Sequence, residues 1–408
     1  MNCRFCNHKL SHVFVDLKES PPSNSFLEKQ HLNQVEPKFP LKIFVCDNCY
    51  LVQVDEYKKA EEIFSNEYVY FSSFSKSWLE HARRYVDKMT HEFGLNSNSL
   101  VIEIASNDGY LLQYFKEKSI PVLGVEPTGN TAKVAIEKGV DTRIDFFGVK
   151  LANDLVKEGR NADLLLGNNV LAHVPDINDF VGGMKIVLKP TGVITMEFPH
   201  LLQLVANNQF DTIYHEHFSY LSFTTVKSIF EKHGLELFNV EELPTHGGSL
   251  RIYAKHKDDK SKTISDAVNH LLNKEREAGI STVDYYRGFQ VKTDKVKADF
   301  LNFLSNCKAQ KKSVVGYGAA AKGNTLLNYC EVGNELISFV VDASPHKQGK
   351  YLPGSKIPVV AEQMIRETKP DYVIIFPWNI KDEIMNQLSY IRDWNAKFVV
   401  AIPELKIL

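Results

Sequence analysis

The chain has 408 residues, of which 44% are hydrophobic and 24% charged, and its formal net charge is −2. This composition is typical of a soluble globular protein, and the length predicts two to three domains. The small net charge gives no support for binding to nucleic acid or to an anionic membrane. No long apolar run and no apolar signal segment occurs in the sequence. We therefore expect a cytoplasmic protein with neither nucleic-acid nor membrane partners.

Four of the six cysteines form two CxxC pairs, Cys3 with Cys6 and Cys46 with Cys49. Together they supply four thiolates, the tetrahedral ligand set that zinc prefers in structural sites. The long separation of the pairs requires an insertion, which includes the turn-rich segment 20–24. The pattern predicts a zinc-binding module over residues 1–65 whose metal builds the fold. A redox-active dithiol pair is the main alternative.

From residue 99 onward, predicted strands alternate with helices, which indicates a mostly parallel sheet that binds its ligand at the carboxyl ends of the strands. We assign residues 66–260 to this domain. The predicted strands cover residues 99–105, 121–126, 162–168 and 192–198.

The loop after the first of these strands lacks the G-x-G-x-x-G turn of dinucleotide sites, whereas the second strand ends in Glu126. An acid at that position can accept hydrogen bonds from the ribose of an adenosine group. A nucleoside ligand without pyrophosphate is therefore expected, and S-adenosylmethionine fits. The residues predicted to bind it are Glu103, Ala105, Asn107, Gly109, Glu126, Asp145, Phe146 and Asn168.

Residues 213–220 read IYHEHFSY and include Tyr214, His215, Glu216 and His217. A histidine can act as base or acid near neutral pH, and a neighbouring carboxylate can fix its tautomer. The window follows the fifth predicted strand, and His173 follows the fourth, so both approach the same rim of the sheet. The residues alone leave a proton-transfer site and a polar loop with core histidines equally open.

The last part of the chain, residues 261–408, begins with an amphipathic connector that carries Val291, Val296, Phe300 and Leu304 at near-helical spacing. A strand then leads into GYGAAAKG, residues 316–323, and predicted strands at 337–342, 372–376 and 398–402 complete a second α/β domain. The glycine pattern matches neither a dinucleotide fingerprint nor a Walker loop. The loop either binds an anion with the help of Lys322 or makes a close contact between helix and sheet.

Six motifs occur in the order typical of one family: the paired CxxC knuckles, EIASNDGYLL, YHEHFSY, THGGSLRIY, GYGAAAKGNTLLNY and FPWN. The chain thus resembles the sugar C-methyltransferases that act on nucleotide-linked 4-keto-deoxyhexoses. The resemblance implies an α/β protein with a small N-terminal zinc-binding module, a class I (Rossmann-like) methyltransferase domain and a C-terminal Rossmann-like domain. It also implies a monomer that holds the sugar nucleotide between the last two domains. Ala105 stands where many relatives have glycine.

By the same resemblance, the catalytic residues are Tyr214, Glu216, His217 and His173, together with a linker tyrosine that is either Tyr68 or Tyr70. We place Tyr68 in the catalytic group and Tyr70 in the cofactor-binding group. The substrate-binding positions are His246, Ser249, Arg251, Lys322, Asn324 and Trp378.

The expected reaction removes a proton from sugar carbon 3, beside the keto group on carbon 4, and gives an enolate that attacks the methyl donor. His217 is the predicted base, Glu216 its orienting or polarising partner, and Tyr214, with His173, the predicted donor to the oxyanion. The alternatives are an O- or N-methyltransferase, a nicotinamide-dependent oxidoreductase that uses Asp342, and a non-catalytic scaffold. The identity of the nucleotide and of the sugar substituents stays open.

Overall fold

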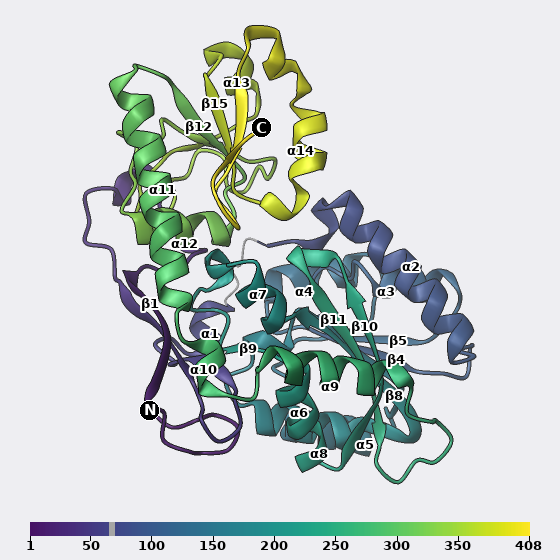
Figure 1. Ribbon diagram of the computed structural model, residues 1–408. Coiled ribbons are helices and arrows are strands. Elements are labelled where there is room, and N and C mark those ends of the chain that lie inside the picture. The colour runs from purple at the N-terminus through teal and green to yellow at the C-terminus, as the bar shows by residue number, and fades with distance from the viewer. Residues whose placement is uncertain (65–69) are drawn as a thin grey trace.

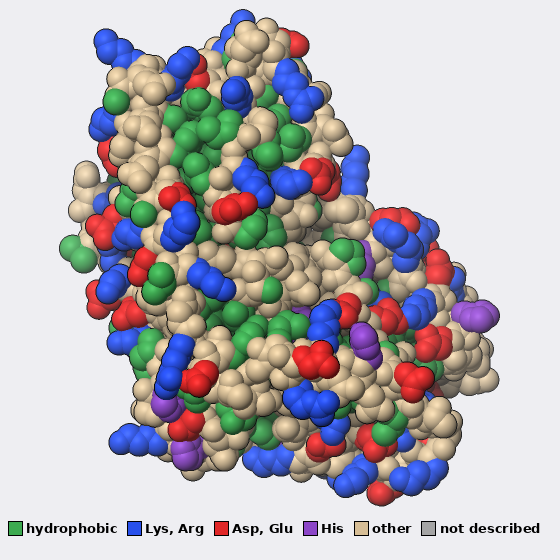
Figure 2. All heavy atoms as spheres, viewed as in Figure 1, with side chains coloured by type: hydrophobic (Ala, Val, Ile, Leu, Met, Phe, Trp, Pro, Cys, Tyr) green, Lys and Arg blue, Asp and Glu red, His purple; other side chains and the backbone are tan. Residues whose placement is uncertain are grey.

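The computed structural model describes residues 1–64 and 70–408, and it arranges them around three sheets (Figure 1). The N-terminal module lies against both of the larger α/β parts, and the C-terminal part forms the upper half of the view. Among the described residues, no helix is long and apolar enough to cross a membrane. Basic and acidic side chains are interspersed over the face shown in Figure 2.

The sheet of the N-terminal module has four antiparallel strands in the order β1-β2-β3-β9. Their bounds are β1 His12–Ser20, β2 Phe39–Val45, β3 Val52–Val54 and β9 Ser219–Tyr220. The fourth strand therefore comes from the IYHEHFSY window, with Tyr220 opposite Val52. This pairing joins the candidate catalytic segment directly to the N-terminal module.

The central sheet has seven strands in the order β10-β11-β8-β7-β4-β5-β6. Strands β4 to β8 are parallel, as predicted, and β11 runs antiparallel to both of its neighbours. The bounds are β4 Val101–Ile104, β5 Val122–Val125, β6 Thr142–Arg143, β7 Ala162–Asn168, β8 Leu188–Pro199, β10 Leu235–Leu243 and β11 Ser249–His256. The order reverses between β4 and β7, and ligands of such sheets bind at the carboxyl ends of the strands at that point.

Helices cover both faces of the central sheet and bury separate apolar clusters against it. On one face lie α2 Lys76–Glu92, α3 Leu112–Glu117 and α4 Gly129–Glu137. On the other face lie α5 Val149–Lys157, α6 Ile177–Val187, α8 Phe223–Lys232 and α9 Asp266–Ala278. The result is the three-layer fold of a class I methyltransferase domain, as predicted.

The C-terminal sheet has six strands in the order β14-β13-β12-β15-β16-β17, parallel except for β17. The strands are β12 Val314–Tyr317, β13 Val340–Val341, β14 Val359–Val360, β15 Tyr372–Ile375, β16 Lys397–Val400 and β17 Lys406–Ile407. The remaining helices are α1 Ala60–Ile63, α7 Leu201–Ala206, α10 Val283–Tyr286, α11 Phe289–Ala309, α12 Ala321–Cys330, α13 Gln363–Thr368 and α14 Lys381–Gln387.

Helix α11 buries Val296, Phe300 and Leu304 as predicted, but Val291 is 71% exposed and the prediction for it was wrong. Its apolar face belongs to one cluster that also contains Phe14 of β1 and Leu327 of α12. The N-terminal module and the C-terminal sheet are therefore packed into a common core rather than merely linked.

Candidate active site

A cavity of about 620 Å³ lies at the carboxyl ends of β4, β5, β6 and β7 and extends to the C-terminal part of the chain. Thirteen of the predicted site residues line it, and they come from both α/β parts. They are Tyr70, Ala105, Asn107, Glu126, Asp145, Phe146, Asn168, His173, Tyr214, Glu216, His217, His246 and Lys322. Tyr68 lies outside the described residues.

One wall is built by the loop after β4 and by Glu126 at the end of β5. The carboxylate of Glu126 accepts hydrogen bonds from the backbone N–H groups of Asn107, at 2.8 Å, and Thr128, at 2.9 Å. The side chain of Asn107 accepts from the N–H of Ser72 and donates to the carbonyl of Tyr70, which holds residues 70–72 across this loop. Tyr70 itself is 48% exposed at the cavity edge.

The lining of this wall suits S-adenosylmethionine. Carboxylates of Glu126, Asp145, Asp176 and Asp179 face the cavity, and they complement a cationic ligand. Phe146 offers an aromatic face for stacking at the end of β6.

Two of the predicted cofactor-binding residues do not line the cavity. Glu103 is fully buried within β4, where burial raises its pKa well above the usual value. Gly109 has a φ of +74°, and a Cβ there would lie 3.2 Å from the Cβ of Ala135, so this glycine allows α4 to pack closely. The structure thus gives these two residues roles inside the fold, and direct ligand contact by them stays a prediction.

Three rings form the opposite wall. The ring of His217 lies 4.6 Å from that of His173 and 4.0 Å from that of Tyr214, centroid to centroid. Nδ1 of His217 donates to the carbonyl of Thr212 at 2.9 Å, and Nδ1 of His173 donates to the backbone carbonyl of Glu216 at 2.8 Å. Because a carbonyl only accepts, each Nδ1 carries the proton and each Nε2 keeps a lone pair.

Burial sets the charge states of this wall. It lowers the pKa of His217 well below its usual value and that of His173 to about 4, so both rings are neutral near pH 7. It raises the pKa of Tyr214 well above 10, so the phenol stays a hydrogen-bond donor. In this state Nδ1 of His173 is engaged by the carbonyl of Glu216 and Nε2 carries no proton, so the arrangement gives no support to the predicted donation to an oxyanion.

Glu216 was expected to orient His217, but its carboxylate oxygens accept instead from Nδ2 of Asn24, each at 2.8 Å. The carbonyl of Thr212 orients His217 in its place. Burial raises the pKa of Glu216 to about 7. The structure thus separates the two neighbours: His217 is held by its own loop and Glu216 by the N-terminal module.

Lys322 comes from the C-terminal part of the chain and lines the same cavity. Its Nζ donates to Oδ1 of Asn379 at 2.7 Å and lies 4.6 Å from the ring centroid of Trp378. Trp378 does not line the cavity; its Nε1 donates to Oδ2 of Asp211 at 2.7 Å. Burial lowers the pKa of Lys322, and burial raises that of Asp211 to about 6.

Three other predicted substrate-binding residues are used inside the protein and do not line the cavity. Arg251 is 4% exposed and donates to Glu197 at 2.9 Å in a buried ion pair. Ser249 donates to the carbonyl of Thr245, and Nδ2 of Asn324 donates to the carbonyl of Ser23. The partners of Arg251 and Asn324 come from segments distant in sequence, whereas that of Ser249 lies four residues away. Direct substrate contact by these three residues stays a prediction. By contrast, His246 lines the cavity and accepts from Nδ2 of Asn169 at 3.1 Å.

The GYGAAAKG loop makes a close packing contact. A Cβ at Gly316 or Gly318 would lie 2.5 Å from an atom of Phe376 or Pro377, respectively. Asp342 already accepts from the backbone N–H of Ala319 at 2.8 Å. Gly316 and Gly318 are therefore packed against neighbouring side chains, and Asp342 accepts a hydrogen bond from the chain itself. A nicotinamide site would need these glycines and this acid for its ligand.

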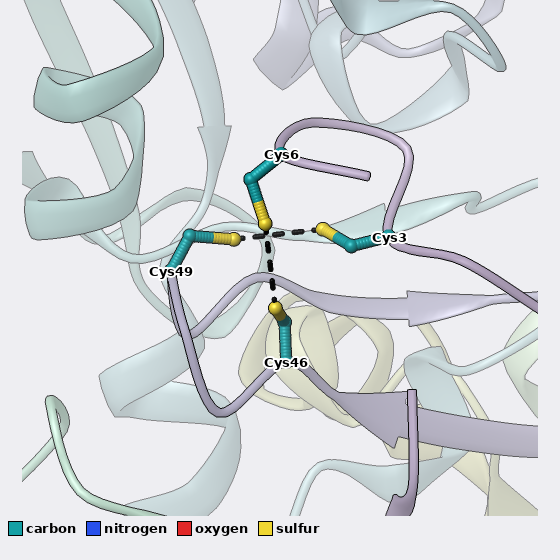
Figure 3. Close-up of side chains that lie close together, drawn as sticks. All are labelled: Cys3, Cys6, Cys46 and Cys49. Carbon is teal, nitrogen blue, oxygen red and sulfur yellow. Dashed lines mark hydrogen bonds between the residues drawn. The ribbon is translucent and has the colours of Figure 1, made fainter. Parts of the chain in front are cut away.

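The four paired cysteines converge at one point of the N-terminal module (Figure 3). The Sγ atoms of Cys3 and Cys49 lie 3.5 Å apart and those of Cys6 and Cys46 3.6 Å apart. Tetrahedral Zn–S bonds of about 2.3 Å place ligand sulfurs about 3.8 Å apart, so the spacing suits a zinc site. Gln53 donates to Cys3 Sγ at 3.2 Å, a contact that stabilises a thiolate.

Asn24, Thr212 and Asn169 were not predicted, and each orients a cavity side chain. Thr212 acts through its backbone carbonyl, which leaves no sequence signal. The nearest signal for Asn24 was the turn-rich composition of its segment.

Three family models match the chain in succession. They are described as "Putative zinc binding domain" over residues 3–64, "Methyltransferase domain" over residues 78–240 and "C-methyltransferase C-terminal domain" over residues 244–403.

The C-methyltransferase NovU of Streptomyces niveus is 34% identical over 406 residues, which cover 100% of this chain and 96% of NovU. Among solved structures, magnesium protoporphyrin IX methyltransferase (ChlM) from Synechocystis is 14% identical, with a TM-score of 0.34 over 43% of this chain and 81% of its own. A methyltransferase from Anabaena variabilis is 15% identical, with a TM-score of 0.35 over 43% of this chain and 84% of its own. From its full-length match to NovU and its matching domain models, the chain belongs to the C-methyltransferase family and is an S-adenosylmethionine-dependent enzyme.

Proposed function

We propose that this enzyme transfers a methyl group to carbon 3 of a nucleotide-linked 4-keto-deoxyhexose. The observation that carries the proposal is the unprotonated Nε2 of His217, in a cavity shared by the methyl-donor loop and the C-terminal part of the chain. An amine or hydroxyl acceptor needs less base chemistry, so the buried histidine favours carbon as the nucleophile. The name of NovU supports C-methylation and says nothing about the acceptor.

In the proposed reaction, Nε2 of His217 takes the proton from carbon 3, and the electron pair of the broken C–H bond forms the enolate. S-adenosylmethionine supplies an electrophilic methyl group, which forms the new C–C bond as its S–C bond breaks. The hydroxyl of Tyr214, which burial keeps protonated, donates to the developing oxyanion. The ammonium of Lys322 adds positive charge to the same cavity.

We further propose that residues 1–65 hold a structural zinc ion through Cys3, Cys6, Cys46 and Cys49. Four thiolates leave no open coordination position, so this zinc stabilises the module and takes no part in the transfer. The methyltransferase domain then spans residues 66–260, and residues 261–408 form the connector and the sugar-nucleotide domain of a monomeric enzyme.

A panel of nucleotide-linked 4-keto sugars, offered with isotopically labelled S-adenosylmethionine, tests the proposal. Mass spectrometry and NMR of the products should place the label on carbon 3. A label on oxygen or nitrogen would refute the proposal.

His217→Asn tests the base directly. The variant should bind S-adenosylhomocysteine like the wild type, because His217 lies on the opposite wall from Glu126, while its turnover falls by about 10²-fold or more. Incubation in D₂O without a methyl donor gives a second readout, since the wild type should exchange the hydrogen on carbon 3 and the variant should not. Unchanged turnover or exchange would contradict the assignment of His217.

A further inference from the structure

The segment after β1 leaves the N-terminal module and crosses to the C-terminal part of the chain. Leu27 and Tyr351 exchange two backbone hydrogen bonds of 2.9 Å, and the carbonyl of Ser23 accepts from Nδ2 of Asn324 at 2.7 Å. The segment is thus fixed on both sides of Asn24, whose side chain lines the cavity. This anchoring makes Asn24 a rigid part of the cavity wall.

Asn24 contacts one catalytic candidate. Its Nδ2 lies 2.8 Å from each carboxylate oxygen of Glu216, while the backbone carbonyl of Glu216 accepts from Nδ1 of His173. An amide N–H can donate to a carboxylate but cannot accept a proton from a carboxylic acid. The contact therefore favours the ionised form of Glu216.

We propose that Asn24 is a positioning residue of the active site, which orients Glu216 and holds it ionised during turnover. The inference rests on the proposed function and extends it, because it makes the N-terminal module a contributor to the site. An ionised Glu216 places a negative charge in the cavity that His217 also lines, where that ring takes up the substrate proton.

Other groups act on the same carboxylate. Burial raises the pKa of Glu216 to about 7, and the amide of Asn24 and the charge of Lys58 oppose that rise. Among the described residues, other titratable side chains that line the same cavity include Glu61, His173, Tyr214, His217 and Lys322. Both histidines are neutral near pH 7, so Asn24 is the direct hydrogen-bond partner that favours the carboxylate.

Asn24→Asp gives the sharpest test because it keeps the shape and places a second carboxylate beside the first. Two carboxylates at this distance share a proton, so the acid limb of the kcat–pH profile should move up by about one pH unit or more. At pH 7, kcat should fall about fivefold or more and recover at higher pH. Asn24→Ala should move the limb in the same direction, since it removes hydrogen bonds to a charged group.

Ser25→Ala is the matched control, because Ser25 is exposed in the same segment and does not line the cavity. It should leave the profile unchanged. In a Glu216→Gln background, Asn24→Asp should no longer shift the acid limb, whereas a purely structural effect would persist. A limb within about 0.3 pH units of wild type for both Asn24 variants, or a shift that survives Glu216→Gln, would overturn the proposal.

A readout without turnover separates this proposal from the proposed function. A carboxyl with a raised folded-state pKa stabilises the protein below its unfolded-state pKa, and that stabilisation is lost as the pH rises through the folded-state pKa. Asn24→Asp should raise the folded-state pKa further, so the protein should go on losing this stabilisation up to a higher pH. Between pH 6 and 9, the melting temperature of the variant should therefore fall more than that of wild type. If no panel sugar is methylated, the proposed function fails, but this result leaves the role of Asn24 standing. If the melting temperatures of wild type and Asn24→Asp depend equally on pH, the role of Asn24 is refuted.

Discussion

Thr325 of α12 holds the backbone that carries His217, although it belongs to the C-terminal part of the chain. Its Oγ1 donates to the carbonyl of Ile213 at 2.8 Å, and both residues are buried. The carbonyl of Thr212, the residue before Ile213, accepts the hydrogen bond from Nδ1 of His217. Thr325→Val keeps the side-chain shape and removes this hydrogen bond, which leaves a buried carbonyl without its donor.

An unsatisfied buried polar group costs about 1–3 kcal/mol. If the segment relieves about half of that cost by shifting, the base moves, and a barrier increase of about 1 kcal/mol lowers the rate about fivefold. We therefore expect Thr325→Val to reduce kcat about fivefold while its affinity for S-adenosylhomocysteine stays close to wild type. Steady-state kinetics and calorimetric titration measure the two quantities.

Thr293→Val is the matched control, because the buried Thr293 donates to the carbonyl of Phe289 within α11, and it does not line the cavity. Both variants should lower the melting temperature, but only Thr325→Val should lower kcat. Equal kcat values for the two variants would refute the idea that the C-terminal part of the chain positions the base.

Ala105 has a φ of +57°, and replacing it by glycine should stabilise the protein by about 0.5 kcal/mol, since relief of left-handed strain outweighs the entropy that glycine adds to the unfolded chain. Ala132→Gly within α4 should instead destabilise it by about 1 kcal/mol, and chemical denaturation compares the two. Cys46→Ser should reduce the zinc content measured by mass spectrometry and lower the melting temperature, whereas Cys307→Ser, at a buried isolated cysteine, should retain the metal.

Local sequence patterns predicted the parallel strands and the meeting of His173 with His217. Apolar runs that end in small or polar residues identify buried parallel strands, and the carboxyl ends of such strands meet at one edge. What these patterns could not predict is partnership over long distances in sequence. Arg251 follows a glycine-rich turn, as a ligand-binding residue would, yet Glu197 of a neighbouring strand neutralises it.

The two-residue strand β9 illustrates the same limit. A strand of two residues is too short to give a periodic signal. Its pairing with β3 nevertheless joins the IYHEHFSY window to the N-terminal module. Asn24 and Glu216 lie 192 positions apart in the sequence, so no local pattern indicates their contact either. Residue types at the site were therefore predictable, whereas the partner of each side chain was not.

Under the proposed function, the charge states of His217 and Glu216 account for how a buried site would remove a proton from carbon. Burial keeps His217 neutral and so ready to accept, but the same burial makes an imidazolium costly. Proton transfer from carbon 3 would create that cation and the enolate anion together, so each stabilises the other inside the cavity. An ionised Glu216 adds a second negative charge to the same cavity, and the hydrogen bonds from Asn24 offset the cost of keeping it ionised. Under the proposed function, we therefore expect the base to be weak in the free enzyme and to become stronger only when the reacting sugar and the charged carboxylate are both present.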